Sequence, residues 1–115
     1  VKQVWDACLA STDASVLAGH FHNTYGMAIA NIYQSLQQGI RVFDSSIAGL
    51  GGCPYAKGAS GNVSTEDLYY LLSNMGLNTG INLDTLMTAS QNISQVLQRN
   101  NPSHYANAYW QQRCA

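Results

Sequence analysis

Two histidines, His20 and His22, lie two residues apart at the end of the apolar run SVLAGHFH. In a β-strand, residues two apart point to the same face and lie roughly 6.5–7 Å apart along the strand. Both imidazoles can therefore reach one metal ion, although a pair of histidines hydrogen-bonded within a protein core is the alternative. Two imidazoles leave room around a metal ion for carboxylate, amide or substrate oxygens. The pair predicts a metal site that other groups must complete.

A single cysteine, Cys53, lies in the segment GLGGCPYAKGASGN (residues 49–62), which holds five of the ten glycines of the chain. A flexible glycine-rich loop rarely supplies a core position, so we expect a chemically active thiol. It can act as a nucleophile or as a proton donor, depending on its pKa. Pro54 restricts the backbone of Cys53 to extended conformations, which helps to aim the side chain. Cys8 lies on a helical stripe with Val4 and Trp5 and is instead typical of a buried, inert cysteine.

The glycine-rich segment also has weaker interpretations. It lacks the G-x-x-x-x-G-K-[ST] spacing of a phosphate-binding loop, and Gly49-Leu-Gly51 only begins a dinucleotide-binding fingerprint. Asn62 ends the segment just before a predicted helix. Its side chain is either a neighbour of the helix cap or an amide-oxygen ligand for a metal.

These residues must be positioned by alternating helices and strands. Helical spacing of apolar residues and strand-like apolar runs predict the following order: a helix over 1–11, a strand over 15–22 buried on both faces, a helix over 27–38, a strand over 40–49, a helix from the capping box at 64–67 to Gly76, and a helix over about 83–99. The tail after residue 99 shows no clear period.

Strands that alternate with helices predict βα units and a parallel sheet. Two strands cannot form a stable sheet with both faces covered, so we expect an α/β fold that is the C-terminal part of a (β/α)8 barrel. That part comprises the last two strands, their flanking helices and a C-terminal helix, with residues 1–115 forming one segment of a single catalytic domain. An open doubly wound sheet is the alternative. In both folds, functional residues gather at the carboxyl ends of the strands, where His20 and His22 lie.

The composition limits the kinds of partner. Net charge is −1 with no basic stripe, so we expect no nucleic acid and no membrane surface as partners. Charged residues make up 10% of the chain, against roughly 25% in typical domains, and the chain begins at Val1, so we expect further sequence or a partner to cover its surface. Three cysteines without a CxxC pair argue against a disulfide scaffold and a zinc ribbon, and they favour a cytoplasmic location.

Most of the chain, about residues 16–98, resembles the C-terminal part of 3-hydroxy-3-methylglutaryl-CoA (HMG-CoA) lyases. The densest part of the likeness is DSSIAGLGGCPYAKGASGNVSTED, together with GHFHNTYG. The resemblance implies a TIM barrel of the divalent-metal lyase and synthase superfamily. It also implies a retro-Claisen reaction, in which HMG-CoA is cleaved to acetyl-CoA and acetoacetate in leucine degradation and ketone-body formation.

The resemblance also implies a role for each candidate residue. His20, His22 and Asn62 correspond to protein ligands of Mg²⁺ or Mn²⁺, and Cys53 corresponds to the catalytic cysteine on a mobile loop over the active site. The glycines of that loop are implied to approach the acyl-CoA substrate: Gly51, Gly52, Gly58 and Gly61. A homodimer is expected, and the resemblance assigns no role to Cys114.

Two departures from the family pattern are visible. Asn23 stands where the lyases commonly have aspartate, as it does in related synthases. The family's first-strand arginine and aspartate lie outside these residues, so we expect the segment to be inactive without the remainder of the barrel. Two alternatives stay open: a Claisen-type acyl-CoA synthase of the same superfamily, and a non-catalytic half-barrel that associates with itself.

Overall fold

The computed structural model describes residues 1–52, 55 and 57–114. In that part of the chain the elements follow in this order: α1 (Lys2–Leu9), η1 (Ala14–Val16), β1 (Ala18–His20), α2 (Ala28–Gln37), β2 (Val42–Asp44), η2 (Ile47–Gly49), α3 (Thr65–Asn74), α4 (Leu83–Val96) and α5 (His104–Arg113). None of these helices is long and apolar enough to span a membrane.

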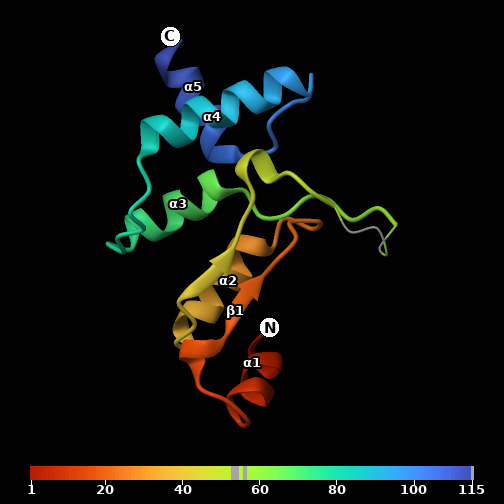
Figure 1. The fold of residues 1–115 in the computed structure, drawn as a ribbon, viewed down its shortest axis with the longest axis vertical. Helices are drawn as coiled ribbons and strands as arrows, with labels where there is room; N and C mark the ends of the chain where they lie inside the picture. Colours follow the sequence, from red (N-terminus) through yellow and green to blue (C-terminus); the bar gives the residue numbers. More distant parts are fainter. Residues whose placement is uncertain (53–54, 56, 115) are drawn as a thin grey trace.

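The two strands form the predicted parallel βα unit. β1 and β2 pair in parallel with His20 opposite Asp44, and α2 connects them (Figure 1). The carboxyl ends of both strands therefore lie at one edge of the sheet, which brings the first histidine beside an aspartate from the next strand. The predicted α/β alternation is confirmed.

The prediction that the first strand is buried on both faces is wrong. Gly19 is buried, whereas Ala18 and His20 on either side of it are exposed. On β2, Phe43 packs against the core and Val42 is 53% exposed. α2 covers one face only, because the described residues contain no second layer for the other face. Both strands are also shorter than predicted: the start of the first run forms η1, and the end of the second forms η2.

The main core lies between α2 and α3. It comprises Ala28, Ile32 and Leu36 of α2 with Val63 and Leu68, and all five side chains are buried. α1 is attached to α2 by a buried hydrogen bond from Trp5 Nε1 to Ser35 Oγ of 2.6 Å. The predicted buried stripe on α1 is borne out only at Trp5: Val4 is 62% exposed and Cys8 is half-buried.

Helix ends were predicted well from local sequence. Ser64 is the N-cap of α3, where its hydroxyl accepts a hydrogen bond from Asp67 N, as the capping-box pattern predicts. Gly39 and Gly76 follow α2 and α3 with φ of +91° and +74°, the left-handed geometry that ends a helix.

The C-terminal tail, for which no regular structure was predicted, forms α5. Ser103 caps it, and a second core of Met87, Ala106 and Tyr109 joins it to α4. Figure 1 shows α4 and α5 at the opposite end of the molecule from α1.

Candidate functional site

The two histidines lie together, as their spacing predicts. His20 ends β1 and His22 follows it, with ring centroids 5.4 Å apart and an angle of 55° between the rings. They belong to the face of the sheet that α2 does not cover, and the His20 side chain is 55% exposed.

Each ring is held through its Nδ1 atom. His22 Nδ1 lies 2.9 Å from the carbonyl oxygen of Ser60. Because a carbonyl can only accept, this bond places the proton on Nδ1 and leaves the lone pair on Nε2. His20 Nδ1 lies 3.2 Å from Asp44 Oδ2, which favours the same arrangement. Metal-binding histidines typically have their second ring nitrogen held in this way by a carboxylate or a carbonyl.

Asn62 joins the histidines through the backbone. It forms an antiparallel bridge with His22. Flanking bonds of 3.0 Å from Val63 N to Phe21 O and of 3.1 Å from Asn23 N to Gly61 O hold the bridge. Side chains directly opposite in such a pair lie on one face with Cβ atoms about 4.5–5.5 Å apart. The bridge thus places the Asn62 side chain on the face that carries both imidazoles.

The nitrogen of the Asn62 side-chain amide is held by a hydrogen bond, whereas its oxygen has no partner among the described residues. Its Nδ2 donates to the carbonyl oxygen of Leu50 at 3.0 Å. Its Oδ1 is buried and has no hydrogen-bond partner among the described residues. A buried acceptor without a partner costs about 1–3 kcal/mol, so such atoms are rare and call for an explanation. An unpartnered amide oxygen on a side chain bridged through its backbone to His22 is the kind of donor that a divalent cation takes.

Two of the four predicted loop glycines are explained by close packing. A Cβ at Gly51 would lie 2.7 Å from Asn62 Nδ2, and one at Gly61 would overlap the carbonyl oxygen of Gly49. Cβ atoms at Gly52 and Gly58 would meet nothing within 4 Å. Gly51 and Gly61 therefore let the two ends of the glycine-rich segment come together around Asn62.

The predicted catalytic cysteine, Cys53, lies outside the described residues. Its described neighbours Tyr55 and Lys57 are exposed. Asn23, the departure from the family pattern, accepts a hydrogen bond from Ala28 N at 3.1 Å, at the start of α2. An amide oxygen performs this role as well as a carboxylate, so the substitution leaves the local structure intact.

Sequence reasoning missed Asp44 and Ser60, which hold the two rings. The parallel pairing of the two strands puts Asp44 opposite His20, so this contact could have been predicted from the register. No sequence pattern indicates that the Ser60 carbonyl holds His22. The described residues contain no group of three or more His, Cys, Asp or Glu side chains arranged to hold a metal ion. A metal centre formed by the described residues would therefore need the amide oxygen of Asn62 beside the two imidazoles.

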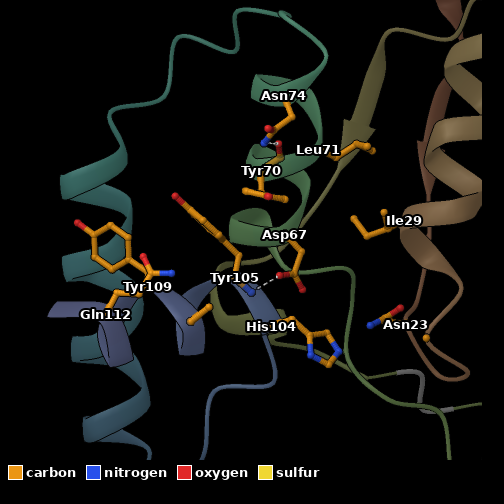
Figure 2. Close-up of a pocket in the computed structure, with 12 residues that line it drawn as sticks. Asn23, Ile29, Asp67, Tyr70, Leu71, Asn74, His104, Tyr105, Tyr109 and Gln112 are labelled. Atoms are coloured by element: carbon orange, nitrogen blue, oxygen red, sulfur yellow. Dashed lines mark hydrogen bonds between the residues drawn. The ribbon is translucent and has the colours of Figure 1, made fainter. Parts of the chain in front are cut away.

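A cavity with a volume of about 680 Å³ lies elsewhere, between α2, α3 and α5. Figure 2 shows Ile29 on one side of it and Tyr70 and Tyr105 on another, and none of the predicted site residues that the structure describes lines it. Burial raises the pKa of the Tyr105 phenol, and the carboxylate of Asp67 is already bonded to Tyr105 N. A smaller cavity of about 190 Å³ borders Asn62 and Ser60.

Comparison with known proteins identifies the family. Residues 1–93 match the family described as HMGL-like. The chain is 52% identical over 107 residues to the 3-hydroxy-3-isohexenylglutaryl-CoA/hydroxy-methylglutaryl-CoA lyase of Pseudomonas aeruginosa, covering 93% of this chain and 36% of the relative. It is 49% identical over 108 residues to the human mitochondrial hydroxymethylglutaryl-CoA lyase, covering 94% of this chain and 33% of the relative.

Solved structures agree with this assignment. The Pseudomonas aeruginosa hydroxymethylglutaryl-CoA lyase superposes with a TM-score of 0.90 at 50% identity, covering 96% of this chain and 37% of that one. An HMG-CoA lyase from Acinetobacter baumannii in complex with coenzyme A and 3-methylmalate gives 0.87 at 39% identity, covering 93% and 35%. The chain thus spans about a third of the length of its relatives, and the predicted fold class, part of a TIM barrel, is confirmed. The chain belongs to the HMGL-like family.

Proposed function

We propose that this chain supplies the metal ligands and the thiol loop of a carbon–carbon lyase that cleaves HMG-CoA to acetyl-CoA and acetoacetate. The observation that supports it most is the unpartnered Oδ1 of Asn62 on the face that carries His20 and His22. The names of the relatives support the substrate class, since those proteins are named as lyases of hydroxymethylglutaryl-CoA and, in one case, also of 3-hydroxy-3-isohexenylglutaryl-CoA.

His20, His22 and Asn62 would hold Mg²⁺ or Mn²⁺ through Nε2, Nε2 and Oδ1. When bound, such a cation supplies a Lewis acid that binds substrate oxygens and lowers the cost of developing alkoxide charge. Asp44 and Ser60 hold the two rings through Nδ1, so that the nitrogen lone pairs stay directed away from the protein backbone. Leu50 holds the amide nitrogen, so that the amide oxygen is the atom offered.

Cys53 is proposed as the proton donor. In the retro-Claisen reaction a base removes the tertiary hydroxyl proton and the C2–C3 bond breaks. The electron pair of that bond passes to the acetyl-CoA enolate, which needs a proton at C2. A thiol on a loop that closes after substrate binding can supply this proton and exclude water from the enolate.

The proposal also covers substrate binding, oligomeric state, cellular location and the activity of the isolated segment. The acyl-CoA substrate would bind with the help of the loop glycines, the enzyme would act as a homodimer in the cytoplasm, and the 115 residues alone would be inactive. The structure of a relative with bound coenzyme A is consistent with an acyl-CoA ligand.

The test is the substitution Cys53→Ala in the full enzyme that contains this chain. Loss of the proton donor should lower kcat for acetoacetate release by about 10²–10⁴-fold with little change in KM. The matched control is Cys8→Ala, which removes a half-buried thiol on α1 and should leave kcat unchanged.

Equal rates in the two variants would contradict the proposed role of Cys53. That result, with activity in the condensation direction instead, would favour a Claisen-type synthase, whose chemistry needs no thiol on this loop.

A further inference from the structure

A buried carboxylate that the proposed chemistry does not use lies behind the site. Glu66, in the first turn of α3, is fully buried and has no ion-pair partner among the described residues. Both of its oxygens accept from the backbone nitrogen of Ala48, at 3.0 and 3.1 Å, and Oε1 also accepts from the hydroxyl of Ser90. A buried carboxylate needs hydrogen-bond donors, and here the backbone donor belongs to Ala48, a residue with an unusual conformation.

Ala48 has a backbone conformation that alanine avoids. Its φ of 51° and ψ of 26° lie in the left-handed region, and its side chain is fully buried. Such a conformation persists only when the surroundings hold it in place. Glu66 holds the N–H of Ala48, and Arg99 Nη2 lies 3.4 Å from its carbonyl oxygen. Side chains from two distant segments thus fix both polar groups of this one residue.

Ala48 is connected to the metal site by a short stretch of backbone. Leu50, two residues later, provides the carbonyl oxygen that accepts from Asn62 Nδ2 at 3.0 Å. Between them, Gly49 packs tightly against the carbonyl oxygen of Asn62, because a Cβ there would lie 3.2 Å from it. The turn at Ala48 therefore sets where the Leu50 carbonyl lies, and that carbonyl sets which way the Asn62 amide points.

We infer that Glu66 is a positioning residue for the metal centre. Its carboxylate holds Ala48 in the left-handed turn, the turn fixes Leu50, and Leu50 directs Asn62 Oδ1 toward the cation. This inference rests on the proposed function, in which Asn62 is a metal ligand. A purely structural role is the competing explanation, since Ser90 links Glu66 to α4 and accepts from Asn101 Nδ2 at 2.6 Å.

The two explanations differ in how a glycine at position 48 behaves. Glycine adopts left-handed backbone angles without strain, so Ala48→Gly should remove the need for the carboxylate at that turn. It should not restore a contact between α3 and α4. The affinity for Mn²⁺ alone, measured by electron paramagnetic resonance on the full enzyme that contains this chain, is the readout.

Glu66→Gln keeps one acceptor oxygen but replaces the other with an amide NH₂ group, which cannot accept from Ala48 N. Because the bond to Ala48 is weakened, Mn²⁺ binding should fall by about tenfold, the lower end of the loss seen when outer-shell partners of metal ligands are replaced. Ala48→Gly should leave the affinity unchanged. The double variant Glu66→Gln, Ala48→Gly should recover most of the lost affinity. The control is Ser94→Ala on α4, whose hydroxyl bonds only to the backbone of Ser90 and which should bind Mn²⁺ normally.

Three results would overturn the inference. The first is a Glu66→Gln variant that melts at lower temperature but binds Mn²⁺ as tightly as the unaltered enzyme, which would leave the proposed function standing. The second is a double variant that binds no better than Glu66→Gln. The third is an unaltered enzyme that binds no Mn²⁺, which would overturn the proposed metal centre as well.

If Glu66→Gln does not fold, Ser90→Ala provides the same test. It keeps the carboxylate and removes one of its hydrogen bonds. We expect a partial loss of Mn²⁺ affinity that Ala48→Gly again reverses. An unchanged affinity in a folded Ser90→Ala variant would contradict the positioning role.

Discussion

The two imidazoles of the candidate site are held by different kinds of acceptor. His22 is bonded to the backbone carbonyl of Ser60, next to a bridge that two backbone hydrogen bonds hold, whereas His20 depends on the side chain of Asp44. The His20–Asp44 contact is exposed, with 55% and 63% of the two side chains accessible, so it adds little to the stability of the fold. Its value lies in fixing the ring and its tautomer for a metal.

Asp44→Ala should therefore affect metal binding and leave the fold intact. Without the carboxylate, the His20 ring is free to rotate and to protonate either nitrogen, and the affinity for Mn²⁺ should fall by about tenfold. Titration with Mn²⁺ under electron paramagnetic resonance measures this change.

The control for Asp44 is Asp6→Ala on α1, another exposed aspartate, which is paired only with Lys2. It should bind Mn²⁺ like the unaltered chain. If the two variants gave the same affinity, Asp44 would have no part in holding His20.

At the scale of elements, α5 is attached through its first turn. Asp67 Oδ1 accepts from Ser103 Oγ and from Tyr105 N, both at 2.9 Å. The carboxylate of α3 therefore acts at the N-terminus of α5, where a negative charge is favourable. Farther along, Tyr109 donates to Asp84 of α4 at 2.9 Å. Burial and this bond raise the pKa of the Tyr109 phenol, so it stays protonated and able to donate to a higher pH than an ordinary tyrosine.

Asp67→Ala should destabilise the chain by about 1–2 kcal/mol, the loss typical of a helix N-cap. Urea denaturation followed by circular dichroism measures the free energy of unfolding, and Asp6→Ala again serves as the control. A free energy of unfolding equal to that of the control would show that Asp67 does not hold α5.

The helices were predictable to different degrees, for physical reasons. α2 and α3 carry apolar residues on one face and glycine just after the end, so spacing alone located them. α5 escaped prediction because its sequence shows no clear amphipathic pattern, although Tyr105, Tyr109 and Trp110 all pack in one cluster with Met87 of α4. The clearest local indication of α5 is its N-cap residue, Ser103. The hydrogen bond from Ser103 to Asp67 that attaches this helix end is visible only in the structure.

The site itself was predictable where residue types and local spacing determine it. Strand alternation places His20 and His22 on one face. The bridge between His22 and Asn62, and the Ser60 carbonyl, depend on how the glycine-rich segment folds back, which no local pattern specifies. The prediction for Cys53 falls outside the described residues and stays a prediction.

At the scale of the whole molecule, one face of the sheet lacks cover within the described chain. Ala18 and His20 of β1 are exposed, Val42 of β2 is 53% exposed, and the molecule is flat, with extents of 49 × 36 × 19 Å. Clustered exposed apolar side chains mark surfaces that associate. The low content of charge, 10%, gives little electrostatic opposition to such association.

We therefore expect the 115-residue chain to associate with itself, in a way that depends on concentration, when sedimentation velocity is measured. Val42→Lys should shift it toward the monomer by placing a charge on the uncovered face. Val96→Lys, at a 76% exposed position on α4, should not. A monomer at every concentration would contradict the view that this face needs a partner.

The binding of Mn²⁺ to the chain and to its Asn62→Ala variant is the most direct test of the central claim. The claim is that two imidazoles and one amide oxygen form a single cation site. It predicts one bound Mn²⁺ per chain and an affinity at least about tenfold weaker in Asn62→Ala, while Asn78→Ala, an exposed asparagine elsewhere, changes nothing. Equal affinity in the unaltered chain and in Asn62→Ala would contradict it.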